Sequence, residues 1–160
     1  MAYELKVDGM AEISELLDKM GQAAPAVAAQ ALYDGAGIMA DEIKKGAEAI
    51  QTAPFKYAKD GVRLPSPEEK EIVTSVGTGI AKFDKNGTEV NTSVGYRNAG
   101  YADLNGKKKP IPVIVNAINS GTSFMKKQPF VRKAARTGSQ RAIAAMKEKI
   151  EKTFENMSKE

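Results

Sequence analysis

The chain has 160 residues, an apolar share of 42% and a formal net charge of +4, with neither cysteine nor histidine. This length fits a single domain over residues 1–160 with one modest hydrophobic core. Without Cys and His there are no disulfides, thiolate nucleophiles, zinc-finger sites or imidazole bases. Carboxylates and lysines remain, so catalysis is not forbidden, but few enzymes of this size lack both residues, and we predict a protein that is not an enzyme and holds no metal or cofactor. No apolar run approaches the ~18 residues of a membrane span, and no signal peptide is visible, so we expect no membrane partner.

Charge is distributed unevenly along the chain. Residues 1–102 carry 11 Lys and Arg against 15 Asp and Glu, whereas residues 103–160 carry 13 against 5. A basic half raises the question of nucleic acid binding. A solvated basic helix face explains the same charge, and we favour that interpretation because the basic half offers few aromatic side chains that could stack on bases.

The N-terminal part predicts a short strand and two helices. Residues 3–7 fit an edge strand, and apolar residues at helical spacing over 13–20 fit a helix that ends at Gly21. A second, longer helix begins at Pro25. Gly35 and Gly37 each cost roughly 1 kcal/mol relative to Ala inside a helix, so either the helix bends there or something packs closely against it. We favour close packing against another helix, because small residues surround both glycines. The apolar stripe of this helix comprises Ala28, Leu32, Gly35, Met39, Ile43 and Ala47.

A loop and a hairpin are predicted next. Residues 51–69 are rich in proline and charge and predict a flexible, weakly packed loop. Residues 72–83 and 88–96 are rich in β-branched and aromatic residues, and Asn86-Gly87 between them is typical of a two-residue hairpin turn. The expected register pairs Phe83 with Val90, Ala81 with Thr92, Gly79 with Val94, and Gly77 with Tyr96, whose ring would cover the bare glycine backbone.

The C-terminal part is predicted to be mostly helical. Residues 97–109 fit a polar loop, and residues 111–118 are apolar and short, so their pattern fits a strand or a helix. We favour a short helix that ends near Gly121. A long helix over 129–157 follows, and Gly138 permits a kink at 137–139. Together these elements predict an α+β fold in which long amphipathic helices pack on a small antiparallel β-sheet, closed by a long C-terminal helix.

Two acidic clusters could in principle bind a cation or hydrolyse a glycoside. They are Asp41-Glu42 and Glu68-Glu69-Glu71. Neither is accompanied by aromatic residues that could stack on a sugar. We therefore interpret both clusters as solvated surface and predict no catalytic residue in them.

The segment 118–134 contains the most informative motif. Gly121-Thr122 precedes a short basic stretch, and Gln128-Pro129-Phe130 then opens the last helix. This arrangement resembles the C-terminal motif of the head–tail joining, or neck, proteins of long-tailed non-contractile bacteriophages. Residues 7–10, before a Leu-rich helix, are similar to the start of that family. The chain departs from the family at Asn119-Ser120, where the usual residues are Glu-Phe, and at Lys133, which replaces Pro.

The resemblance implies a non-enzymatic virion protein of a phage or prophage. Such a protein completes the tail, joins it to the head connector and forms a homo-oligomeric ring around the DNA path. Its partners would be copies of itself, connector and tail proteins, and DNA that passes through without specific contacts. It would act in the cytoplasm of the bacterial host during assembly and afterwards in the virion. The implied assembly motif consists of Asn119, Gly121, Thr122, Lys126, Gln128, Pro129 and Phe130.

Two other functions stay open at this level. The first is a small non-specific nucleic-acid-binding protein that uses Lys107, Lys108 and Lys109 together with the basic C-terminal helix, and whose affinity would fall steeply with salt. The second is an enzyme that relies on carboxylates, for which substitution of the acidic residues would abolish turnover.

Overall fold

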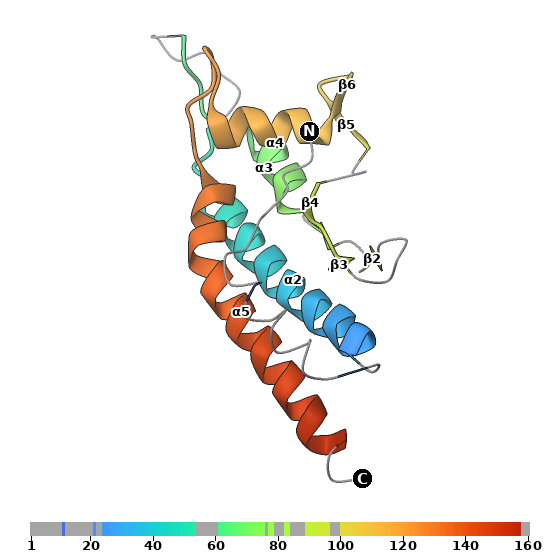
Figure 1. Cartoon of the computed structure of the whole chain (residues 1–160). Coiled ribbons are helices and arrows are strands. Elements are labelled where there is room, and N and C mark those ends of the chain that lie inside the picture. Colours follow the sequence, from blue (N-terminus) through green and yellow to red (C-terminus); the bar gives the residue numbers. More distant parts are fainter. Residues whose placement is uncertain are drawn as a thin grey trace.

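The computed structural model of the chain describes residues 11, 21, 24–53, 61–75, 77–78, 82–83, 89–96 and 100–157. The predicted strand at 3–7, the first helix at 13–20 and the Asn86-Gly87 turn lie outside these residues. In the described part the fold is α+β, as predicted: helices pack with small antiparallel sheets, and the long C-terminal helix lies against the first long helix (Figure 1). None of the helices in this part is long and apolar enough to span a bilayer.

Two long antiparallel helices, α2 (Ala24–Glu48) and α5 (Phe130–Met157), run side by side (Figure 1). Both follow the predicted bounds closely. The expected close contact at Gly35 is confirmed, because a Cβ there would lie 2.8 Å from Cγ and Sδ of Met146. α5 continues unbroken through the predicted kink at 137–139, where Gly138 instead permits close approach to Met39.

Helix α3 (Pro67–Thr74) takes up the end of the predicted loop and the first three residues, 72–74, of the first predicted strand. The Ser66 hydroxyl accepts the Glu69 N–H, and the Glu69 carboxylate accepts the Ser66 N–H, which makes a reciprocal capping box. Pro67 starts the first turn. These capping signals outweigh the β-branched residues that suggested a strand. The loop prediction for 51–69 is also wrong about packing near α3, because Pro65 and Ser66 are buried.

Two short antiparallel ladders follow. Of the four predicted pairs they confirm one and contradict two, since Val94 pairs with Thr78 instead of Gly79, and the fourth involves Ala81, which lies outside the described residues. Phe83 pairs with Val90 as expected, but Gly77 pairs with Gly95 instead of Tyr96. Between the two ladders the pairing therefore shifts by one residue. The strands are β1 (Gly77–Thr78) with β4 (Val94–Gly95), and β2 (Lys82–Phe83) with β3 (Val90–Asn91).

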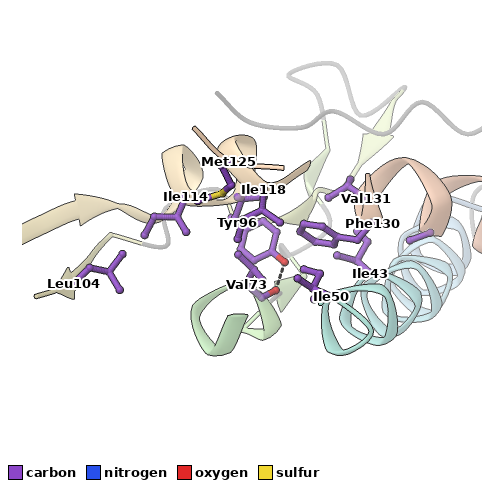
Figure 2. Close-up of a cluster of buried hydrophobic side chains, with 13 residues drawn as sticks. Ile43, Ile50, Val73, Tyr96, Leu104, Ile114, Ile118, Met125, Phe130 and Val131 are labelled. Carbon is purple, nitrogen blue, oxygen red and sulfur yellow. Dashed lines mark hydrogen bonds between the residues drawn. The ribbon is translucent and has the colours of Figure 1, made fainter. Parts of the chain in front are cut away.

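Tyr96 shows the consequence of that shift. Moving the register by one residue turns a side chain to the opposite face of the strand. The Tyr96 ring is buried in the core, and its hydroxyl donates to the carbonyl oxygen of Val73 near the end of α3 (Figure 2). The prediction that this ring covers Gly77 is therefore wrong.

A second hairpin occupies the predicted polar loop at 97–109. Its strands are β5 (Tyr101–Leu104) and β6 (Lys107–Pro110). Asn105 and Gly106 connect them with φ angles of 54° and 74°. Asn-Gly tolerates two consecutive positive φ values, which is what a tight two-residue turn needs. The lysine run therefore lies on a strand, not in a loop.

Helix α4 (Ile111–Ser120) confirms the short helix favoured for 111–118, and it ends at Gly121. Its inner face contributes Ile114, Val115 and Ile118 to the larger of two core clusters. Figure 2 shows this cluster, where side chains from α4 meet residues of α2, α3 and α5. The smaller cluster lies between α2 and α5 and contains Ala31, Met39, Ala142, Met146 and Ile150.

Candidate interaction surface around residues 118–134

The motif identified in the sequence forms the junction between α4 and α5. Its loop, residues 121–129, pairs with an earlier segment of the chain, because the Arg63 N–H donates to the Phe124 carbonyl at 2.8 Å and the Lys126 N–H donates to the Arg63 carbonyl at 2.9 Å. Figure 1 shows this pair of segments extending beyond one end of α4. Backbone hydrogen bonds with both the N–H and the carbonyl of Arg63 thus hold the loop in place.

Two of the predicted assembly residues are buried inside the subunit. Asn119 is 1% exposed, and its Oδ1 accepts the Val131 N–H at 3.1 Å in the first turn of α5. Its Nδ2 has no hydrogen-bond partner in the part of the chain described. Phe130 is buried in the larger core cluster. These residues stabilise the junction and present nothing to a partner.

Three further motif residues shape the loop. Gln128 makes two hydrogen bonds to the Gln51 backbone, at 2.9 Å to its N–H and 3.0 Å to its carbonyl. A Cβ at Gly121, where φ is 77°, would lie 2.9 Å from Cβ of Lys127, so only glycine fits. Pro129 precedes α5, and its carbonyl accepts the Lys133 N–H at 3.1 Å.

The apex of the loop is the part of the motif that solvent reaches. Thr122 and Lys126 are exposed, as predicted, although the Thr122 hydroxyl also accepts the Met125 N–H at 3.0 Å and so closes the turn. Phe124 is 60% exposed and was not singled out in the sequence. A lone aromatic residue in a polar loop that also contains Gly-Thr and two lysines was the signal that could have identified it.

Arg63, whose backbone hydrogen-bonds to the loop, also forms a largely buried ion pair with Glu69. The Arg63 guanidinium donates two hydrogen bonds to the Glu69 carboxylate, at 2.6 and 2.7 Å. Burial raises the pKa of Glu69, but the hydrogen bonds from Arg63 and Ser66 outweigh it and hold that pKa below its ordinary value. The prediction that the whole 68–71 cluster is solvated is therefore wrong at Glu69.

The other acidic cluster is partly engaged as well. Asp41 is exposed on α2, whereas Glu42 forms salt bridges with Lys45 and, across to α5, with Arg141. Glu42 therefore connects the two long helices, and the prediction of a purely solvated cluster is wrong for it. Within the described ranges, no three acidic side chains come together where they could hold a metal ion.

The three lysines proposed to lie near DNA are exposed but do not share one face. Residues alternate along a strand, so Lys108 points away from its two neighbours. Lys107 and Lys109 border a cavity of about 260 Å³ together with Leu104, with Ser66 at the N-cap of α3 and with Glu69 in its first turn. The three lysines of β6 therefore do not form one row of positive charge that could follow a phosphate backbone.

Charge is unusually one-sided from the end of β5 to the middle of α5. Residues 104–147 contain ten Lys and Arg and no Asp or Glu. The segment includes β6, α4, the loop and the first half of α5. Any partner of this region has to tolerate or neutralise a strongly cationic surface.

Comparison with protein-family models, with curated proteins and with solved structures found no match. The family expectation from the sequence therefore has only the residues quoted for it, mainly segment 118–134, and the order of the elements behind it. The geometry adds that four of the seven motif residues, Asn119, Gly121, Gln128 and Phe130, hold the junction together.

Proposed function

We propose that the chain is a structural neck protein of a phage or prophage, which completes the tail by joining it to the head connector. The observation that carries this proposal is the junction at 118–134, where buried motif residues hold a loop whose apex is exposed. Binding residues are often found on loops that a rigid scaffold positions. The apex residues Thr122, Phe124 and Lys126 are suited to contact a neighbouring protein.

The remainder of the fold supports a mechanical role in this proposal. Small residues let α2 and α5 approach each other closely. Because tightly packed interiors deform little, this helix pair should be rigid. A heterologous contact repeated between copies would close such subunits into a homo-oligomeric ring around the DNA path. DNA would pass through without specific contacts.

Deletion of the gene from the phage or prophage that encodes it tests the proposal. We expect infected or induced cells to accumulate filled heads and separate tails, counted by negative-stain electron microscopy. Purified protein added to that lysate should restore joined particles and infectious titre, whereas buffer alone should not. Normally joined particles in the deletion strain would rule the proposal out.

Non-specific nucleic acid binding is the second candidate, and the absence of any carboxylate from residues 104–147 favours it. Binding of the purified protein to a short DNA duplex over a series of salt concentrations would test it. A steep salt dependence with no sequence preference would support this function, because neutralised phosphates release their counterions. For a neck protein we expect only weak binding, since DNA must slide past it, and nanomolar sequence-selective affinity would contradict that role.

A further inference from the structure

The side of α5 that faces away from α2 is cationic over its first three turns. Gly138 packs against Met39 of α2 and so marks the inner side of α5, while β3 and β4 lie on the other side of α2 (Figure 1). Each residue turns roughly 100° around a helix axis, so Arg136 and Gln140, each two positions away, lie about 160° from Gly138. We call this side the outer face of α5. Its four exposed polar residues are Arg132, Lys133, Arg136 and Gln140.

The three cations of the outer face are not neutralised within the described part of the chain. Arg132, Lys133 and Arg136 form no salt bridge with another described residue. Residues 104–147 contain no Asp or Glu. The next carboxylate along α5 is Glu148, eight residues or about 12 Å beyond the end of the face.

Carboxylates of α2 do not reach the outer face either. Gly46 of α2 packs against Phe130 and marks the side of α2 that meets α5. Asp41 and Glu48, which are exposed on this half of α2, lie about 140° and 160° around the helix from Gly46. Glu42 does reach α5, but its carboxylate pairs with Arg141 on the flank of that helix. The outer face therefore keeps its three positive charges.

This charge arrangement destabilises the helix that carries it. Arg132 and Arg136 are like charges at i and i+4, and both lie near the positive end of the helix dipole. The first turn of α5 holds no acidic residue, whereas α3 has Glu68 and Glu69 in its first turn. The second half of α5 also follows the favourable pattern, because Glu148 pairs with Lys152. Cations that cost stability and pair with nothing in the subunit indicate a negatively charged partner.

We propose that the outer face of α5 contacts the phosphate backbone of duplex DNA without reading its sequence. Arg132, Arg136 and Gln140 follow one another at i, i+4 spacing, so their side chains start about 5–6 Å apart in one row. Guanidinium and amide groups donate hydrogen bonds to phosphate oxygens, and Lys133 beside the row adds charge. The choice of DNA over RNA rests on the proposed function, in which DNA passes through the ring.

A phosphate backbone fits this face better than a protein or a membrane does. Protein interfaces have an apolar, often aromatic centre, and helices that lie on membranes expose large apolar residues. The exposed residues beside the row are only Thr137 and Ala144. The lysines of β6 fit a phosphate backbone less well, because Lys107 and Lys109 border the cavity that also contains Glu69.

The salt dependence of DNA binding tests which cations contact the phosphates. Fluorescence anisotropy of a short labelled duplex would measure the affinity of the full-length protein between about 50 and 200 mM salt. Each neutralised phosphate adds about 0.9 to the slope of log affinity against log salt, so Arg132→Gln with Arg136→Gln should reduce that slope by about two. The reduction should be the same for duplexes of different sequence. The melting temperature should not fall, because the double variant removes two like charges from one helix side.

Control variants remove the same charge from other places. Lys44→Gln with Lys45→Gln changes two exposed lysines of α2 and should leave the slope unchanged. An equal reduction from Lys108→Gln with Lys109→Gln would place the contact on β6 and overturn the inference. Undetectable binding by the wild type at about 50 mM salt would also overturn it. Tighter binding of polyglutamate than of the duplex would do so as well, because it would indicate an acidic protein as the partner.

The inference and the proposed function fail in different ways. If deletion of the gene prevents head–tail joining but the Arg132 and Arg136 double variant keeps the wild-type slope, the neck role survives and the outer face of α5 does not contact DNA. If deletion leaves joining intact but the double variant loses the slope, the phosphate contact survives and the neck role falls.

Discussion

The α2–α5 pair differs from the layer of α3, α4 and the β5–β6 hairpin in which kinds of residue it buries and which it exposes. The pair packs through small residues, with Gly35 against Met146 and Gly138 against Met39, and its charges lie mostly outside. The layer buries polar groups, including the Arg63–Glu69 pair, and it exposes large hydrophobic residues. Burying charge and exposing apolar surface both cost stability, so the layer is less suited to be a rigid support and more suited to contact another molecule.

Phe130 lies where the two regions meet, and its removal should have the largest effect. Its ring belongs to the larger core cluster, and its backbone carbonyl lies next to Gly46 of α2. Phe130→Ala should lower the free energy of unfolding by about 3–5 kcal/mol through lost burial and a residual cavity. Denaturant unfolding measures this loss. Phe130→Leu should cost less than about 1.5 kcal/mol, and equal losses from both variants would show that the ring is not packed as described.

The buried ion pair should give the next largest effect, and it depends on pH. Glu69→Gln removes the carboxylate that receives two hydrogen bonds from the largely buried Arg63 guanidinium, so we expect a loss of about 3 kcal/mol at neutral pH. Because the pKa of Glu69 is below its ordinary value of 4.5, the carboxylate contributes stability above pH 4.5 and loses that contribution as the pH falls further. Unfolding measured at pH 7 and at pH 3 should therefore show the two proteins converging in acid.

The exposed neighbour Glu71 provides the control for that experiment. Glu71→Gln removes the same charge from the same helix but from a solvated position. We expect a change of less than about 0.5 kcal/mol at either pH. If Glu69→Gln behaves like Glu71→Gln, the ion pair does not stabilise the layer.

Two glycines of α2 give a matched test of the helix pair. Gly35→Ala would place Cβ against the buried Met146 side chain, so we expect a loss of roughly 1–2 kcal/mol. Gly37→Ala meets no atom within 4 Å and should instead stabilise the protein by about 0.5–1 kcal/mol, because Ala favours a helix. Thermal melts of the two variants should shift in opposite directions. Shifts of the same sign would contradict the close approach of α2 and α5.

Apart from the Glu71 control, Tyr96→Phe should give the smallest of the predicted losses of stability. Its hydroxyl donates to the Val73 carbonyl inside the core, and Tyr96→Phe would remove that hydrogen bond while keeping the ring. We expect a loss of about 1 kcal/mol by denaturant unfolding. An unchanged midpoint would mean that the hydroxyl adds nothing beyond the packing of the ring.

The candidate site was only partly predictable from the sequence. Gly121 and Pro129 mark the ends of a loop through their backbone preferences, and the exposure of Thr122 and Lys126 follows from their polarity. The roles of Asn119 and Gln128 depend on partners at Val131 and at the distant Gln51, which no local pattern contains. Phe124 was missed although a lone aromatic residue in a polar loop was a usable signal, and the fold shows that it is 60% exposed.

By itself the sequence determined the long elements of this protein. The apolar stripes of α2 and α5 repeat over many residues, so their helical period can be identified from the sequence alone, although packing of the two stripes supplies most of the stability. The short elements were decided by the tertiary structure. Residues 72–74 are helical because the capping box at Ser66 and the buried Arg63–Glu69 pair outweigh their weak β preference. The register beside Tyr96 was likewise set by the core that receives its ring, since two-residue ladders contribute too little to choose it.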